Sequence, residues 1–201
     1  LGIEMPPLSY DLVLHVATMA ATILFFFNDI IGLLGEWVSG LFHKDKRDRT
    51  GWHIGWAVFI GTLVTGAIGM AIKDLAEAAM TNSLMVGLGL VFTGLILISS
   101  RLIRKGLGRV STFDGIWVGI AQGIAVMPGV SRSGMTMMAG TAAGICREEV
   151  FRFSFLLSIP AILGATLMQA KEVGGIDLFR ESLPHGWYIG CLLYNSDAAD
   201  E

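Results

Sequence analysis

The stretch Pro128-Gly129-Val130-Ser131-Arg132-Ser133-Gly134-Met135-Thr136 places one arginine and three hydroxyl side chains between two apolar runs, 113–127 and 135–145. Arginine is costly at bilayer depth, by roughly 2.5–3.5 kcal/mol on insertion scales, so an arginine between apolar segments indicates a functional site. Both runs are shorter than the roughly 17 residues that a membrane-spanning helix needs. Non-helical backbone is tolerated at membrane depth only where it is buried in protein or lines a polar cavity. The stretch therefore predicts a re-entrant helical hairpin over 113–145, with its tip, 128–134, facing a cavity.

The residues at this tip suit an anion better than a cation. Arg132 offers a planar fork of donors that matches phosphate oxygens, and the three hydroxyls add further donors. Gly129 and Gly134 allow backbone N–H groups to approach a ligand closely. Hydrolysis of a diphosphate depends on positioning and on neutralising the charge of the transferring phosphoryl group. Ser131 has no neighbouring histidine or lysine that would activate it as a nucleophile, so its sequence context favours ligand binding.

The composition predicts an all-α, polytopic membrane protein that forms a single membrane domain over 1–201. The chain is 53% hydrophobic and only 15% charged, with a mean hydropathy of +0.65. An average soluble domain has roughly 25% charged residues. Cys146 and Cys191 are too few to form a disulfide framework or a metal cluster. The sequence carries no signature of nucleic-acid binding.

Long apolar runs predict about four crossing helices. The first is predicted at 10–42, with an interfacial second part, and the others at 52–72, 84–100 and 151–170. Pro160 is expected to kink the last of these helices. A further apolar run stops at an acidic tail, so 186–201 is interpreted as a truncated helix and tail. Glycines in the second and third helices predict close packing between helices. They are Gly61, Gly66, Gly69, Gly87, Gly89 and Gly94.

Positive charges predict how the chain is oriented in the membrane. Loops 43–50 and 101–111 each carry four Lys or Arg residues and are separated by two crossings. Loops of this kind lie on the cytoplasmic side. The intervening loop, 73–83, is expected outside, and Arg147 and Arg152 fall back inside. The chain emerges on the same side of the membrane whether 113–145 is a hairpin or two full crossings. The loop charges alone therefore do not decide between these two arrangements.

The stretch 128–136 resembles the second signature of the bacterial undecaprenyl-diphosphate phosphatases, the bacitracin-resistance integral membrane enzymes. The run Phe153-Ser154-Phe155-Leu156-Leu157-Ser158-Ile159-Pro160 is similar to the serine- and proline-bearing helix that follows this signature. Gln122, the entry 113–115 and the early stretch 10–15 also lie where the family has similar segments. The resemblance covers about residues 1–170. It implies an inverted-repeat fold with two re-entrant hairpins, in the inner (plasma) membrane of a bacterium.

The resemblance also implies an activity and a role for individual residues. The family removes the terminal phosphate of undecaprenyl diphosphate, which regenerates the monophosphate carrier lipid of cell-wall synthesis. The implied partners are a polyprenyl diphosphate lipid and the membrane, and a homodimer is left open. By this likeness Arg132 and Ser131 are the catalytic residues. The implied substrate-binding residues are Ser133, Thr136, Gly129, Gly134 and Gln122.

One part of the family pattern is absent from 1–201. The family's first signature, a glutamate pair followed by a Ser-Ser-x-Gly-His turn, would lie upstream of Leu1. It supplies the acidic groups associated with a divalent cation, Mg²⁺ or Ca²⁺, and the candidate nucleophile or general base. We therefore expect the ligands of that cation outside 1–201, and no catalytic activity from 1–201 alone. The chain is expected to begin inside a longer protein.

Two other classes of function compete with the phosphatase. A membrane transporter or lipid flippase would also use a re-entrant hairpin and an inverted repeat. Such a transporter more often has an acidic residue inside a crossing helix, and no acidic residue lies well within the predicted core segments. The second competitor is a purely structural membrane fragment. A soluble-type acid phosphatase is disfavoured because no histidine follows Arg132 within the hairpin.

Overall fold

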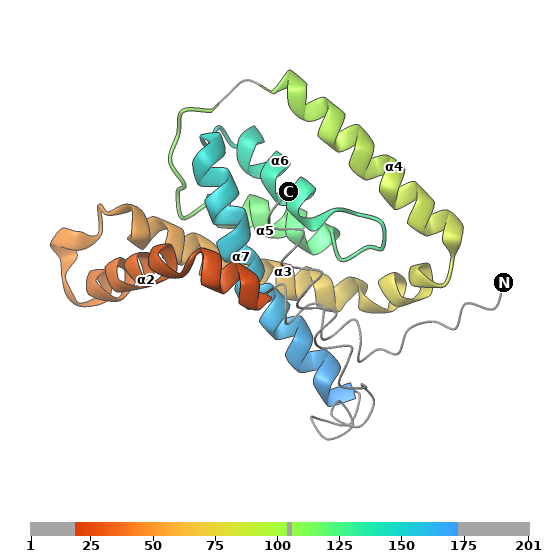
Figure 1. Cartoon of the computed structure of the whole chain (residues 1–201), viewed down its shortest axis with the longest axis horizontal. Helices are drawn as coiled ribbons and strands as arrows, with labels where there is room; N and C mark the ends of the chain where they lie inside the picture. Colours follow the sequence, from red (N-terminus) through yellow and green to blue (C-terminus); the bar gives the residue numbers. More distant parts are fainter. Residues whose placement is uncertain (1–18, 104–105, 173–201) are drawn as a thin grey trace. The chain divides into compact units, whose positions relative to one another are not determined.

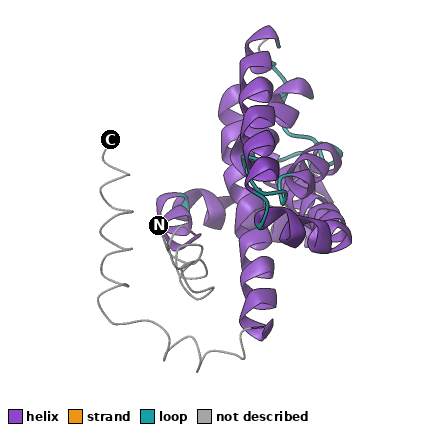
Figure 2. Ribbon diagram, turned by 90° about the vertical axis from the view of Figure 1, so that its right-hand side faces the viewer, coloured by secondary structure: helices purple, strands orange, loops and turns teal. Residues whose placement is uncertain are grey.

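The computed structural model describes residues 19–103 and 106–172. Apart from one isolated bridge between Gly108 and Ile145, the regular elements of these residues are helices, which confirms the all-α prediction (Figures 1 and 2). The start of the predicted helix 10–42 and the whole of 186–201 lie outside the described residues. The chain divides into two compact units, and the single membrane domain over 1–201 stays a prediction. The larger unit is Asn28–Ser158, and the smaller one consists of Leu1–Phe27 and Ile159–Glu201.

Three of the described helices are long and apolar enough to cross a membrane: Thr50–Met80, Ser83–Leu102 and Arg147–Met168. A fourth candidate is a broken pair, Met19–Phe25 followed by α2 (Phe27–Phe42). Large apolar side chains are exposed along all of these helices, as expected where a helix faces lipid rather than water. The helices of the described residues are therefore those of a polytopic membrane protein.

Helix α3 (Thr50–Met80) is longer than the predicted 52–72, and it includes most of the segment 73–83 that the sequence predicts as an outside loop. The charged residues of this segment are good helix formers. Lys73 and Glu77 stand four residues apart and form an ion pair at 3.6 Å, which supports a helix. The predicted loop 73–83 was too long because its charged residues were interpreted as part of the loop rather than as the end of α3.

The other two long helices also begin earlier than predicted. Asn82 caps α4 (Ser83–Ser99), because its side-chain oxygen accepts N–H groups of the first turn. Helix α7 (Arg147–Glu172) begins with an acidic first turn, which suits the positive end of a helix. Pro160 lies inside α7, and the helix continues beyond it.

The predicted helix over 10–42 is not continuous, because Met19–Phe25 and α2 are separated at Phe26. Beyond this break the sequence changes from the largely apolar run 16–27 to one that carries charged residues at intervals. Two of these charged residues, Asp29 and Glu36, make contacts with other helices. The break therefore lies where the expected interfacial stretch begins.

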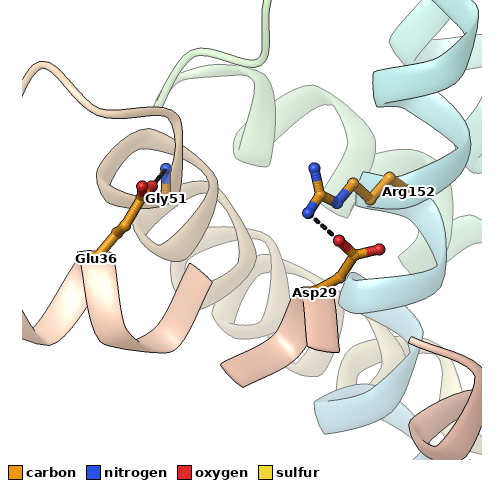
Figure 3. Close-up of polar contacts among 4 residues, drawn as sticks. All are labelled: Asp29, Glu36, Gly51 and Arg152. Carbon is orange, nitrogen blue, oxygen red and sulfur yellow. Dashed lines mark hydrogen bonds and ion pairs between the residues drawn. The ribbon is translucent and has the colours of Figure 1, made fainter. Parts of the chain in front are cut away.

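Both carboxylates attach α2 to other helices of the larger unit (Figure 3). Asp29 forms an ion pair with Arg152 in the first half of α7. Glu36 accepts a hydrogen bond from the Gly51 N–H at 2.9 Å, in the first turn of α3. The Glu36 carboxylate also lies 3.7 Å from the Arg49 guanidinium. A carboxylate at this position satisfies an orphan N–H and favours the helix dipole. Glu36 thus caps a helix whose own N-cap residue, Arg49, makes no capping hydrogen bond with its side chain.

We expect Asp29→Asn to lower the free energy of unfolding by about 1 kcal/mol, a modest value because both partners are partly exposed. Arg152 would lose its ion-pair partner, while its Nε is already buried without an acceptor among the described residues. Denaturant unfolding in mixed micelles measures the effect. Glu77→Gln, which breaks the more exposed pair with Lys73, is the matched control and should cost less than about 0.5 kcal/mol. Equal losses for the two substitutions would contradict the prediction.

Two short helices, α5 (Asp114–Ile124) and α6 (Arg132–Ala142), form a helical hairpin over the predicted segment. In Figure 1 the hairpin lies between α3 and α4; α5 packs along α3, and α6 packs against α5 and α4. Each helix is too short to span a bilayer. Helix α6 ends in a Schellman motif at Gly144, whose φ is 86°. Entry of this hairpin into the membrane stays a prediction.

Small residues let α5 approach α3 with almost no side chain between them. A Cβ on Gly115 would lie closer than 3.0 Å to the backbone of Ala57, and one on Gly119 would lie 2.7 Å from the carbonyl oxygen of Gly61. Close packing is confirmed for Gly61 and also for Gly89. For three other predicted glycines a Cβ would meet nothing within 4 Å among the described residues, so their close packing stays a prediction. They are Gly66, Gly87 and Gly94.

Candidate anion-binding site

The turn between α5 and α6 has the residue pattern of a type II β-turn. The N–H of Val130 bonds to the carbonyl of Met127 at 3.2 Å, which closes the turn around Pro128 and Gly129. Proline presets the backbone at the first central position, and the second requires a positive φ. Gly129 has a φ of 81°. The first part of the predicted tip, 128–130, is therefore a defined turn, whereas 132–134 already belong to α6.

Ser131 is the N-cap of α6. Its backbone is extended, and its hydroxyl oxygen accepts a hydrogen bond from the Gly134 N–H at 3.2 Å. The hydroxyl hydrogen is left to donate to a ligand oxygen. No histidine, lysine or carboxylate of the described chain is hydrogen-bonded to this hydroxyl. The geometry thus supports Ser131 as a binding group and provides no activated nucleophile.

Arg132 is the first residue of α6, so its side chain starts at the positive end of a helix. Its guanidinium is half-buried and forms neither an ion pair nor a hydrogen bond with another described residue. The backbone N–H groups of Arg132 and Ser133 also have no acceptor among the described residues. One cation and two amide groups therefore lie at one end of α6, and no anion of the described residues neutralises them. This arrangement is suited to phosphate.

The remaining hydroxyl of the motif faces inward. Thr136 is 1% exposed, and its Oγ1 lies 2.5 Å from the Oγ of Ser154 on α7. The same oxygen lies 3.0 Å and 3.1 Å from the carbonyl oxygens of Arg132 and Ser133. Thr136 therefore joins α6 to α7. Its hydroxyl is buried, whereas Ser133 is exposed. Gly134 is buried at the start of α6.

Gln122 lies on α5 and faces α3 rather than solvent. It is 2% exposed, and its Nε2 donates to the Oγ1 of Thr65 at 3.4 Å. Thr65 in turn donates to the Gly119 carbonyl at 3.0 Å. The Oε1 of Gln122 is buried and has no partner in the described part of the chain. The structure thus places this predicted substrate-binding residue in the α3–α5 interface.

Sequence reasoning missed two residues that support the motif. Thr93 of α4 is hydrogen-bonded to the turn, and Ser154 of α7 is bonded to Thr136. The available signal for Thr93 was a polar residue in the middle of an apolar run. Ser154 lies in the segment quoted for the family resemblance, but nothing in the sequence pairs it with Thr136.

The carboxylates of the described residues do not form a cation site. No group of three or more His, Cys, Asp or Glu side chains is close enough to hold a metal within 19–103 and 106–172. Several carboxylates are already used by the fold: Asp29 pairs with Arg152, Glu149 accepts the Val110 N–H, and Asp114 accepts the Ser111 N–H. Where the ligands of a divalent cation lie therefore stays a prediction.

Comparison with known proteins adds an independent finding. A family model described as bacitracin resistance protein BacA matches residues 2–193. The chain is 36% identical over 201 residues to an undecaprenyl-diphosphatase of Methanosphaera stadtmanae, covering 93% of this chain and 72% of that protein. It is 38% identical over 171 residues to an undecaprenyl-diphosphatase of Moorella thermoacetica, covering 84% of this chain and 63% of that one.

A third relative is an undecaprenyl-diphosphatase of Mycobacterium bovis, 39% identical over 167 residues, with 82% of this chain and 60% of that protein covered. The chain thus spans 60–72% of the length of these three relatives. The family match covers nearly all of the chain, including the turn and the helices that hold it. The chain belongs to the bacitracin resistance protein BacA family, as its resemblance to the undecaprenyl-diphosphate phosphatases predicted.

Proposed function

We propose that the full-length protein hydrolyses undecaprenyl diphosphate to undecaprenyl phosphate and inorganic phosphate, in the inner (plasma) membrane. The observation that carries this proposal is the half-buried Arg132 guanidinium, which has no counter-anion among the described residues and lies beside free N–H groups. The names of the relatives give the reaction class. A membrane lipid that ends in a diphosphate is the anion that both observations fit.

In the proposed reaction, the diphosphate lies at the N-terminus of α6. Water adds to the terminal phosphorus, and the bond from that phosphorus to the bridging oxygen breaks, so the bridging oxygen stays on the lipid monophosphate. Negative charge grows on that oxygen and on the transferring phosphoryl group. Arg132, the two free N–H groups and the hydroxyls of Ser131 and Ser133 donate to these oxygens and stabilise the charge. Binding and charge neutralisation are thus the contribution of this hairpin.

Among the described residues no group of three or more His, Cys, Asp or Glu side chains could hold a metal ion, and no base is hydrogen-bonded to Ser131. We assign the cation ligands and the base to segments outside 19–172. The polyprenyl tail would lie in the bilayer beside the exposed apolar side chains of the spanning helices. Inactivity of residues 1–201 alone stays a prediction of the same assignment.

Phosphate release tests the proposal. The full-length protein in detergent micelles is given undecaprenyl diphosphate with Mg²⁺ or Ca²⁺, and with a chelator in a parallel sample. We expect one phosphate per lipid molecule, release that depends on the cation, and no second phosphate from the monophosphate product. Movement of labelled lipid between vesicle leaflets by a folded protein that releases no phosphate would favour a lipid flippase and reject the phosphatase.

A further inference from the structure

We propose that Thr93 of α4 is a positioning residue that fixes the turn immediately before Arg132. The inference rests on the proposed function for its catalytic consequence, and on the structure for its geometry. Thr93 lies 36 residues from Gly129 in the chain. It contacts the turn through one hydroxyl group, and it would act on the substrate only through Arg132.

The Thr93 hydroxyl serves two backbone groups of the turn. Its Oγ1 donates to the carbonyl oxygen of Gly129 at 3.2 Å and accepts the N–H of Ser131 at 3.0 Å. Neither backbone group has another partner among the described residues. Thr93 is 8% exposed and is the one buried side chain of α4. The Thr93 side chain therefore satisfies the Gly129 carbonyl and the Ser131 N–H, the two polar backbone groups that flank Val130.

The backbone of α4 approaches the turn closely enough to make these bonds direct. A Cβ on Gly89 would lie closer than 3.0 Å to the carbonyl oxygen of Pro128 and 3.1 Å from the Cα of Gly129. A Cβ on Gly129 would in turn lie 3.0 Å from the backbone nitrogen of Leu90. Two glycines thus remove the side chains that would otherwise separate helix and turn. Thr93, one helical turn beyond Gly89, then reaches the Ser131 amide.

Arg132 follows the restrained residue directly. The Ser131 N–H is held by Thr93, and the Ser131 side chain caps α6, so the same residue fixes where α6 begins. Removing the Thr93 hydroxyl would leave a carbonyl and an N–H unpaired in a water-poor environment, and the turn would rotate to find other partners. The guanidinium and the two free amides would move with it. Catalysis is sensitive to small displacements of the groups that position the substrate.

A packing role for Thr93 makes the opposite prediction from a positioning role. Thr93→Val keeps the shape of the side chain and loses the hydroxyl, whereas Thr93→Ser keeps the hydroxyl and loses the methyl group. If packing matters, the serine variant is the more damaged protein. If positioning matters, the valine variant loses function and the serine variant restores it.

The test uses the full-length protein with two readouts: kcat for undecaprenyl diphosphate, and the Kd of inorganic diphosphate. We expect Thr93→Val to lower kcat and diphosphate affinity by about 10-fold to 100-fold, with Thr93→Ser within about threefold of wild type. The matched control is Thr62→Val in α3, because the Thr62 hydroxyl donates only to Val58 of its own helix at 2.7 Å. This control should leave both readouts close to wild type.

Several outcomes would overturn the inference. They are wild-type values for Thr93→Val, equal damage in Thr93→Val and Thr93→Ser, and a Thr93→Val protein that is unfolded at the assay temperature. A wild type that binds diphosphate without hydrolysing a lipid diphosphate rejects the proposed function alone, and Thr93 is then judged on binding. A wild type that neither binds nor hydrolyses rejects both.

Discussion

Arg132→Ala is expected to lower kcat/KM for undecaprenyl diphosphate by about 10²-fold to 10³-fold in the full-length protein. The guanidinium is the one side-chain cation at the start of α6, and no described carboxylate neutralises it. Its removal therefore takes away charge that stabilises the phosphoryl oxygens and leaves the fold without a broken internal ion pair. Phosphate release under single-turnover conditions measures the chemical step.

Arg132→Lys separates charge from geometry at the same position. Lysine keeps the positive charge but loses the planar fork that contacts two phosphate oxygens at once. We expect a smaller loss than for alanine, with kcat reduced more than substrate affinity. Arg101→Ala is the control, because Arg101 is exposed and lies far along the chain from the turn. Wild-type kinetics in a folded Arg132→Ala protein would contradict the assignment, as would an equal loss in the Arg101 control.

The hairpin could be predicted because it depends on lengths and on one local motif. The two apolar runs flanking 128–134 are too short to cross a bilayer, and α5 and α6 have this property in the structure. The Pro128-Gly129 pair predicts a turn from its own backbone preferences. Local sequence therefore predicts the turn at Pro128-Gly129, but it placed Arg132 in the tip 128–134, whereas α6 already begins at Arg132.

The partners of these residues could not be predicted, because they come from other helices. Whether Thr136 faces a ligand or Ser154 depends on how α7 crosses α6, and the two residues are 18 positions apart. Gln122 faces Thr65, which is 57 positions away, and so lies in a helix interface rather than at the turn. A single sequence contains the periodicity of each helix but not the rotation of one helix against the next.

Gly129→Ala is expected to lower kcat for undecaprenyl diphosphate by about 10²-fold, because the position imposes two separate constraints. The φ of 81° is in the left-handed region, where an alanine costs roughly 1–2 kcal/mol. The added Cβ would also lie closer than 3.0 Å to the carbonyl oxygen of Val86 on α4. Because these are backbone atoms of a long helix, the turn must move away from α4, and the bonds to Thr93 break.

Gly144→Ala imposes the first constraint without the second, so a comparison with Gly129→Ala isolates the effect of the contact with α4. Gly144 has a φ of 86°, so an alanine there has the same backbone cost, but its Cβ would meet nothing within 4 Å. We expect Gly144→Ala to reduce stability by about 1–2 kcal/mol while kcat stays within about threefold of wild type. Denaturant unfolding and phosphate release on the same two proteins separate stability from activity. If both variants lose stability equally and only Gly129→Ala loses activity, the contact of the turn with α4 sets the position of Arg132. Equal activity in the two variants would show that this contact has no role in catalysis.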